Sequence, residues 1–137
     1  KLFLDFFLEN WTSVPNSFTE PAYKEYLRCF SDPETVRAMC ADYRSVTLDM
    51  EHDDADRGIK LSCPVLVLWG SDMSKRPGWQ TGKNLDMMSV WRLRASNVRG
   101  KALECGHFIP EEKPDELVSE LFDFILSIEK DQEPKHD

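Results

Sequence analysis

The sequence lacks any uninterrupted apolar run of about 20 residues, which is the length that a membrane-spanning helix requires. We therefore expect no membrane partner. The first stretch, KLFLDFFLENW, is apolar, but it contains Asp5 and Glu9, and no small-residue cleavage site follows it. These features are not typical of a secretory signal peptide. We interpret the stretch as a helix cut from a longer chain.

Basic residues are scarce relative to acidic ones. The sequence has 17 Lys and Arg residues against 25 Asp and Glu residues, which gives a formal net charge of -8. This balance argues against binding nucleic acid through its phosphates. It does not exclude a small anionic substrate, because the local charge in a site can oppose the net charge.

Cysteine pairs of the C-x-x-C type are also missing, which argues against a zinc site or a redox motif. The even number of cysteines would permit two disulfides, but the sequence does not resemble a small secreted scaffold. We expect reduced, mostly buried thiols and a cytoplasmic protein. The cysteines concerned are Cys29, Cys40, Cys63 and Cys105.

Neither a glycine-rich phosphate loop nor a G-x-S-x-G nucleophile elbow is present. The acidic stretch DMEHDDADR (49–57) does not have the spacing of a calcium loop, because its glycine and closing glutamate are misplaced. We expect a solvated linker at this stretch, and we expect neither a metal nor a cofactor in the protein.

What is present divides near residue 60. Before that point the patterns predict helices over residues 1–11, 19–30 and 31–46, with Thr19 and Ser31 or Asp32 at typical N-terminal capping positions. The first helix is apolar nearly all round, which predicts burial between other elements. The third helix has a shared face made of Val36, Met39, Cys40 and Tyr43.

After residue 60 the pattern alternates between strands and helices. We expect a buried strand at 64–69, a helix at 84–95, a weaker strand at 98–105 and a last helix from Pro114. The helix at 84–95 should bury a stripe made of Leu85, Met88, Trp91 and Ala95. The last helix should bury a stripe made of Leu117, Leu121, Ile125 and Ile128, widened by Val118, Phe122 and Phe124.

A strand-helix-strand unit crosses over right-handed and forms a parallel pair. Because two parallel strands need both faces and most edges covered, the pair predicts further strands. We therefore expect the carboxyl-terminal part of a larger α/β protein, with its missing strands upstream.

His107 is the first candidate for chemistry, because it directly follows the second predicted strand. Ligands of open α/β sheets bind outside the carboxyl ends of the strands, and an imidazole can act as a base near neutral pH. Gly106 would free His107 for a sharp turn. A half-buried histidine that bonds a loop carbonyl is an equal alternative.

Asp72 follows the first predicted strand and could orient His107 as a triad acid does, although a turn cap is favoured. Tyr43 could direct its hydroxyl at a ligand anion, although the pattern alone favours a core tyrosine. Cys105 is a poor candidate for a nucleophile, because its side chain cannot align well with that of His107.

Three segments resemble the α/β-hydrolase superfamily, and most closely its haloacetate (fluoroacetate) dehalogenase branch. They are YLRCFSDPETVRAMCADYRSVTLDMEHDDAD (26–56), CPVLVLWG (63–70) and RGKALECGHFIPEEKPDEL (99–117). The last two occur widely among hydrolases with helical caps, whereas the first is more particular to the dehalogenase branch. The resemblance implies cap helices and a return linker over residues 1–58, and the last strands and helices of the hydrolase core over 59–137.

The resemblance also implies a mechanism. In such enzymes an aspartate attacks the carbon that bears the halogen and expels halide, and a histidine activates water to hydrolyse the resulting ester. His107 matches that histidine, and Tyr43 matches a cap tyrosine that helps to hold the halide. The nucleophile, the arginines that hold the substrate carboxylate and the other halide ligands would lie upstream of Lys1.

Two features depart from the family pattern. Asp72 lies two residues after Gly70, whereas relatives that place the triad acid here commonly have it three residues after the glycine. The loop MSKRPGWQTGKN (73–84) is longer and more basic than is usual for the family. Since this loop borders the site, the resemblance leaves the exact substrate open.

The resemblance implies that the whole protein cleaves the carbon–halogen bond of a small 2-haloacid. This segment alone would be inactive, because the nucleophile is missing from it. The nearest alternative is an epoxide hydrolase of the same fold. A non-catalytic scaffold and a complete interaction module with an exposed strand edge are further alternatives. The expected partners are a small-molecule substrate and the upstream part of the core, and a homodimer stays open.

Overall fold

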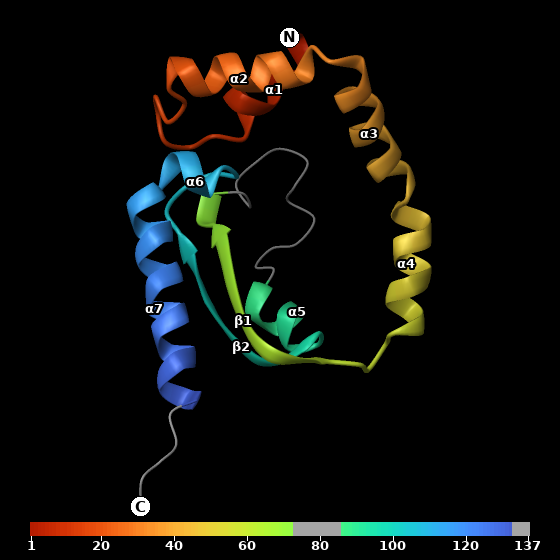
Figure 1. Cartoon of the computed structure of the whole chain (residues 1–137), viewed down its shortest axis with the longest axis vertical. Coiled ribbons are helices and arrows are strands. Elements are labelled where there is room, and N and C mark those ends of the chain that lie inside the picture. The colour runs from red at the N-terminus through yellow and green to blue at the C-terminus, as the bar shows by residue number, and fades with distance from the viewer. Residues whose placement is uncertain (73–85, 133–137) are drawn as a thin grey trace, which may run out of the picture.

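The computed structural model describes residues 1–72 and 86–132. A run of helices comes first and a strand-helix-strand unit follows, as predicted, and the chain closes with two helices where one was expected (Figure 1). The elements are α1 (Leu2–Asn10), α2 (Glu20–Phe30), α3 (Pro33–Arg44), α4 (Val46–Ala55), β1 (Leu61–Gly70), α5 (Met87–Arg92), β2 (Ala95–Leu103), α6 (Ile109–Glu112) and α7 (Pro114–Gln132).

Side-chain caps fix where α2 and α3 begin. The Thr19 side chain accepts a hydrogen bond from the Ala22 amide, and the Asp32 side chain accepts one from the Glu34 amide. Each helix has a proline in its first turn, where the missing N–H costs nothing. These are the positions that the sequence predicted.

The solvated linker predicted over residues 49–57 is mostly helix. After α3 ends at Arg44, the chain starts a new helix, α4, one residue later, and every residue of α4 is exposed. The prediction was wrong about conformation, because the local sequence tolerates a helix without burial. The described residues contain no cluster of histidine, cysteine and carboxylate side chains that could hold a metal ion.

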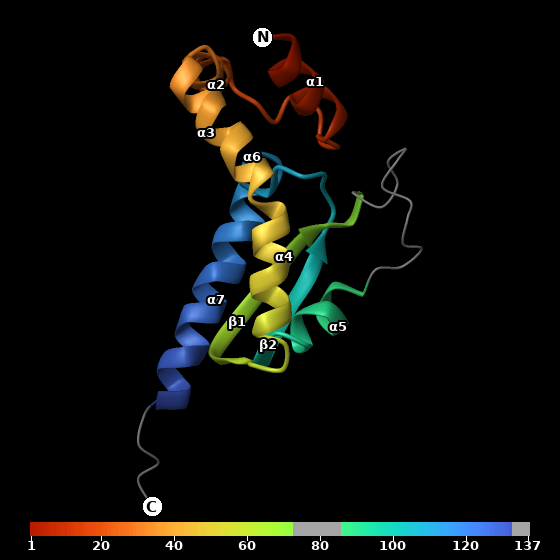
Figure 2. The ribbon, with the colours of Figure 1, turned by 90° about the vertical axis from the view of Figure 1, so that its right-hand side faces the viewer.

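Strands β1 and β2 pair in parallel, in a register that runs from Val65 opposite Val98 to Gly70 opposite Leu103. Both strands begin three residues earlier than predicted, and the register shifts between Leu61 and Pro64. An irregularity is expected beside a proline, since proline has no N–H to donate to the ladder. Figures 1 and 2 show α1 and α2 at the end of the molecule toward which both strands run.

Helix α5 is shorter than the predicted helix over 84–95. It begins after Asp86, whose side chain accepts a hydrogen bond from the Ser89 amide, and it ends at Arg92. Ala95, assigned by its pattern to the helical stripe, instead opens β2 opposite Leu61 and is buried. Strand pairing thus overrides the helical pattern, and Leu85 lies outside the described residues.

Helix α7 lies on one side of the strand pair and α5 on the other (Figure 1). The Arg99 guanidinium of β2 donates to the Ser127 hydroxyl of α7 at 2.9 Å and lies 4.8 Å from the centre of the Phe124 ring. Leu121 and Ile125, predicted as core, are 42% and 50% exposed, and Val118 and Phe122, predicted to widen that stripe, are 49% and 61% exposed. This prediction was wrong for these four residues, because no described residue covers that part of the helix.

Among the residues that the structure describes, the buried apolar core is small and consists of Leu4, Val67, Ala95, Leu103 and Cys105. Leu4 is the only buried residue of α1, so burial of that helix all round was a wrong prediction. All four cysteines are free, as predicted, but Cys105 alone among them is buried. None of the helices in residues 1–72 and 86–132 is long and apolar enough to cross a bilayer.

Candidate functional site

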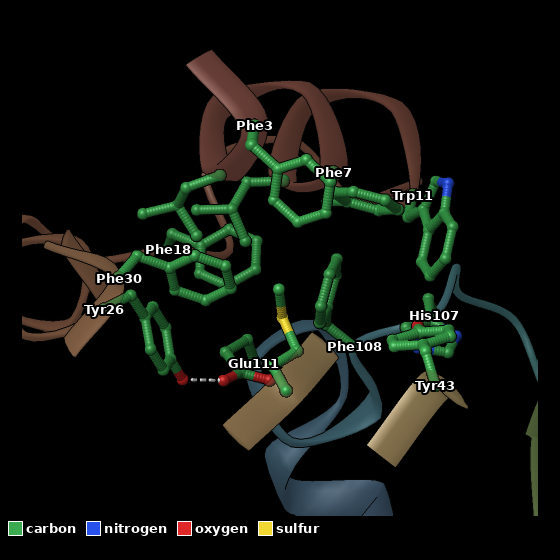
Figure 3. A pocket seen from close by; sticks show the side chains of 13 residues that line it. Phe3, Phe7, Trp11, Phe18, Tyr26, Phe30, Tyr43, His107, Phe108 and Glu111 are labelled. Carbon is green, nitrogen blue, oxygen red and sulfur yellow. Dashed lines mark hydrogen bonds between the residues drawn. The ribbon is translucent and has the colours of Figure 1, made fainter. Parts of the chain in front are cut away.

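A cavity of about 280 Å³ lies between the amino-terminal helices and the loop that follows β2 (Figure 3). Its polar lining residues among those described are Tyr26, Tyr43, His107 and Glu111. Most of the remaining wall is aromatic and is formed by Phe3, Phe7, Trp11, Phe18, Phe30 and Phe108. The cavity therefore offers an apolar container with a few polar groups, as ligand sites commonly do.

His107 reaches this cavity because the loop after β2 crosses over to the segment that follows α1. Its backbone N–H donates to the Trp11 carbonyl at 2.7 Å. Its ring meets the rings of Trp11 and Phe108 edge to face, at centroid distances of 4.8 and 5.1 Å. The backbone of His107 thus bonds a distant carbonyl, while its imidazole lies against the cavity.

Tyr43 lines the same cavity from α3. Its side chain is 71% exposed, so the alternative of a core tyrosine is wrong. The chain folds back on itself so that this helix and the loop after β2, which are far apart in sequence, contribute to one site (Figure 3). A phenol and an imidazole at one cavity provide a hydrogen-bond donor and a base.

Tyr26 and Glu111 form a second polar pair in the wall of the cavity. The Tyr26 hydroxyl donates to the Glu111 carboxylate, and this hydrogen bond is the main cause that raises the pKa of Tyr26 to about 12. Tyr26 is therefore a neutral phenol at physiological pH. This pair could not be predicted from the sequence, because its members lie on α2 and α6, 85 residues apart.

Glu112, the next residue of α6, is not among the residues that line the cavity and is only 5% exposed. Its Oε2 accepts the N–H groups of Ser13, Val14 and Gly106 at 2.7, 3.0 and 2.8 Å, and its Oε1 accepts that of Phe108 at 3.0 Å. Burial alone raises the pKa of this carboxyl, but the four backbone donors outweigh burial and lower the pKa overall. Glu112 is thus an ionised, fully bonded carboxylate.

Gly106 is required by close packing and not by a sharp turn. Gly58 is the only described glycine with a positive φ, so Gly106 uses an ordinary backbone conformation. A Cβ at Gly106 would lie 2.3 Å from the Trp11 carbonyl oxygen and 2.9 Å from Glu112 Oε1. The predicted reason for this glycine was therefore wrong, although its importance for the loop of His107 stands.

The loops after the two strands touch. The Asp72 backbone N–H donates to the Cys105 carbonyl at 3.1 Å, and the Ser71 hydroxyl lies 3.4 Å from Asp72 Oδ1. The pKa of the Cys105 thiol is raised, first by burial and then by the charge of Glu112, so the thiol stays protonated. This agrees with the exclusion of Cys105 as a nucleophile. The predicted insertion at 73–84 lies outside the described residues.

These strands, the helices beside them and the position of the site define part of the α/β-hydrolase fold. The chain is a relative of α/β hydrolases and matches about the carboxyl-terminal 40% of their structures. A candidate α/β hydrolase from Nostoc sp PCC 7120 superposes with a TM-score of 0.81 at 42% identity, over 90% of this chain and 41% of the other. A candidate epoxide hydrolase from Pseudomonas aeruginosa gives a TM-score of 0.81 at 34% identity, over 94% and 42% of the two chains.

Two enzymes are similar to this chain in sequence. A fluoroacetate dehalogenase from Burkholderia sp is 32% identical over 111 residues, which are 80% of this chain and 34% of the enzyme. A soluble epoxide hydrolase from Corynebacterium sp. is 32% identical over 115 residues, 83% of this chain and 37% of the enzyme. The chain thus spans about a third of the length of these relatives. No family model matches it.

Proposed function

We propose that this chain supplies the water-activating base of a hydrolase that works through an aspartyl ester, and that the substrate is a small 2-haloacid. The observation that carries the proposal is that His107 and Tyr43 line one cavity although they come from distant elements. The dehalogenase relative supports the choice of substrate. The nucleophilic aspartate and the groups that bind the substrate carboxylate would come from residues outside this chain.

The two residues would act in successive steps. The Tyr43 hydroxyl would donate a hydrogen bond to the leaving halide while the aspartate forms the ester. The His107 imidazole would then take a proton from water as the water oxygen attacks the ester carbonyl carbon. His107 and Tyr43 are both exposed in this chain, so the exclusion of bulk water, which strengthens polar interactions, would depend on residues outside it.

Replacing His107 with Ala in the full-length protein should leave ester formation intact and block its hydrolysis. Intact-mass measurement after mixing with fluoroacetate or chloroacetate should then show the mass of a carboxymethyl ester of the aspartate, together with one equivalent of halide per active site. The unsubstituted protein should show turnover and no lasting adduct. Full turnover by His107→Ala, with no adduct, would disprove the assigned role.

An epoxide hydrolase is the second candidate, and the cavity itself favours it. Tyr43 lines the cavity, and none of the lining residues in the described part of the chain is a lysine or an arginine. The Tyr43 phenol can protonate an epoxide oxygen, whereas the Tyr26 hydroxyl already donates to Glu111, and a neutral epoxide needs no cation for binding. The relative from Corynebacterium supports the same choice.

Product analysis separates the two candidates. A 2-haloacid substrate should yield halide and a 2-hydroxyacid, whereas an epoxide such as styrene oxide should yield a diol. Halide release with fluoroacetate and no diol with styrene oxide would support the dehalogenase, and the reverse would support the epoxide hydrolase. The absence of both reactions in the full-length protein would favour a non-catalytic scaffold. We also propose a cytoplasmic location, which the free state of all four cysteines supports.

A further inference from the structure

We infer that Glu112 is a positioning residue for His107: its buried carboxylate fastens the loop of His107 to the segment after α1, so that the imidazole faces the cavity. The inference rests on the proposed function, in which His107 activates water. It concerns the ester-hydrolysis step alone.

The contacts of Glu112 fall on both sides of His107. Its carboxylate accepts the amide of Gly106, just before the histidine, and the amide of Phe108, just after it, at 2.8 and 3.0 Å. The amide of His107 itself donates to the Trp11 carbonyl at 2.7 Å. Three consecutive amides of the loop are therefore held, two of them by one side chain.

The same carboxylate also holds the opposite wall of the site. Its Oε2 accepts the amides of Ser13 and Val14 at 2.7 and 3.0 Å, two and three residues after Trp11. Trp11 in turn presents its ring to the ring of His107. The Glu112 carboxylate thus fixes the distance between His107 and Trp11.

Only a carboxylate of this length satisfies all four donors. A glutamine could place its carbonyl oxygen at the position that receives three N–H groups, but its amide nitrogen would then face the Phe108 N–H, and two donors would oppose each other. An aspartate keeps the charge but is one methylene shorter. Each change should loosen the loop without removing any group from the cavity.

The step that depends on this geometry is proton transfer from water. The water oxygen bonds to the ester carbonyl carbon as His107 takes its proton; the intermediate then breaks the bond to the product oxygen, and that oxygen receives the proton. Ester formation needs no group that Glu112 positions. A misplacement of the base by about 1 Å can slow such a step by about 100-fold.

The test compares Glu112→Gln, Glu112→Asp and the control Asp115→Asn in the full-length protein. Asp115 is an exposed carboxylate at the start of α7 and lies outside the cavity lining. After mixing with fluoroacetate, or with styrene oxide if that is the substrate, the ester is followed by rapid quenching and intact mass. We expect both Glu112 variants to form the ester at the normal rate and to accumulate it, with hydrolysis slowed about 10- to 100-fold. The control should not accumulate it.

A merely structural role would give another pattern, in which a smaller fraction of the protein forms the ester and that fraction hydrolyses it at the normal rate. That result would overturn the inference. If Glu112→Gln does not fold, Glu112→Asp decides between the two patterns. The proposed function fails separately, if His107→Ala accumulates no ester from either substrate.

Discussion

Glu111 and Glu112 are adjacent residues with opposite surroundings. The Glu111 carboxylate lines the cavity and accepts the Tyr26 hydroxyl, whereas the Glu112 carboxylate is buried among backbone amides. A short helix separates them by about 100° around its axis, which is enough to send one side chain into the cavity and the other beneath the loop. The single turn of α6 therefore provides one side chain to the wall of the cavity and another that holds the loop of His107.

The lowered pKa of Glu112 predicts how stability depends on pH. Since the folded-state pKa lies below the ordinary value of 4.5, this carboxylate should stabilise the fold fully above about pH 4.5, and the contribution should disappear as pH falls through the folded-state pKa. Urea unfolding from pH 7 to pH 3 should show a difference between the unsubstituted protein and Glu112→Gln. That difference should be largest above pH 5 and should shrink on acidification. A difference that stays constant with pH would contradict the prediction.

Sequence reasoning found the residues whose position along the chain is informative. His107 follows a strand, and Tyr43 lies in a segment that resembles a known family, so both could be named, and both line the cavity. Glu112 could not be named, because its partners Ser13 and Val14 are 99 and 98 residues away. Its only signal was a carboxylate close to the Gly-His pair, which equally suits a solvated turn.

At the scale of elements, the ends of the two parallel strands decide where the site lies. Gly70 ends β1 and packs directly beneath the loop of His107: a Cβ at Gly70 would lie 1.7 Å from the Gly106 carbonyl oxygen. The parallel register places Gly70 opposite Leu103, so the loops that follow the two strands start from the same edge. The strand pair thus supports the loop that carries His107.

Replacing Gly70 with Ala should displace that loop. The added methyl meets backbone and no flexible side chain, so the loop must shift, and overpacking of this kind costs about 1–3 kcal/mol of unfolding free energy. We expect a lower melting temperature together with slower ester hydrolysis. Gly58→Ala is the contrasting variant: its Cβ would meet nothing within 4 Å, but its φ of 95° strains any other residue. That variant should lower stability alone. Unchanged melting and turnover in Gly70→Ala would refute the expectation.

The elements themselves could be predicted where a capping residue or a long apolar run marks them. The starts of α2 and α3 and the strand pair were predicted in this way. The helix expected over 84–95 is present as α5, but its end was predicted wrongly, because Ala95 has a helical spacing and yet pairs with Leu61 in the sheet. Whether such a residue joins a helix or a strand depends on its contact with another strand, and that contact cannot be recognised from the neighbouring residues in the sequence.

At the scale of the whole molecule, large apolar side chains lie exposed on several elements. Phe122 and Leu126 of α7 are 61% and 49% exposed, and Leu2 of α1 is 87% exposed. Phe122 and Leu126 are four residues apart and so share one face of α7, and exposed apolar surface of this kind marks an interaction face. The matched residues make up 34% and 37% of the two relatives, which are therefore more than twice as long as this chain, and the rest of such a protein is the cover that we propose for α7.

This predicts how the 137-residue chain behaves by itself. We expect it to bind an apolar fluorescent dye, to associate in size-exclusion chromatography and to lack a cooperative thermal transition as a monomer. Phe122→Ser combined with Ile125→Ser should reduce dye binding, whereas Ser119→Ala, an exposed control on the same helix, should not. A monomer that melts cooperatively and binds no dye would show that the chain needs no cover.

The contacts of Glu112 have a consequence for protein synthesis. The amides of Ser13 and Val14 are synthesised 99 and 98 residues before the carboxylate that binds them. Closing so long a loop costs chain entropy, so this contact should form late in folding. A nascent chain would therefore carry an unfinished cavity wall until translation has passed Glu112. His107, the proposed base, reaches its final position only when almost all of the described chain has been synthesised.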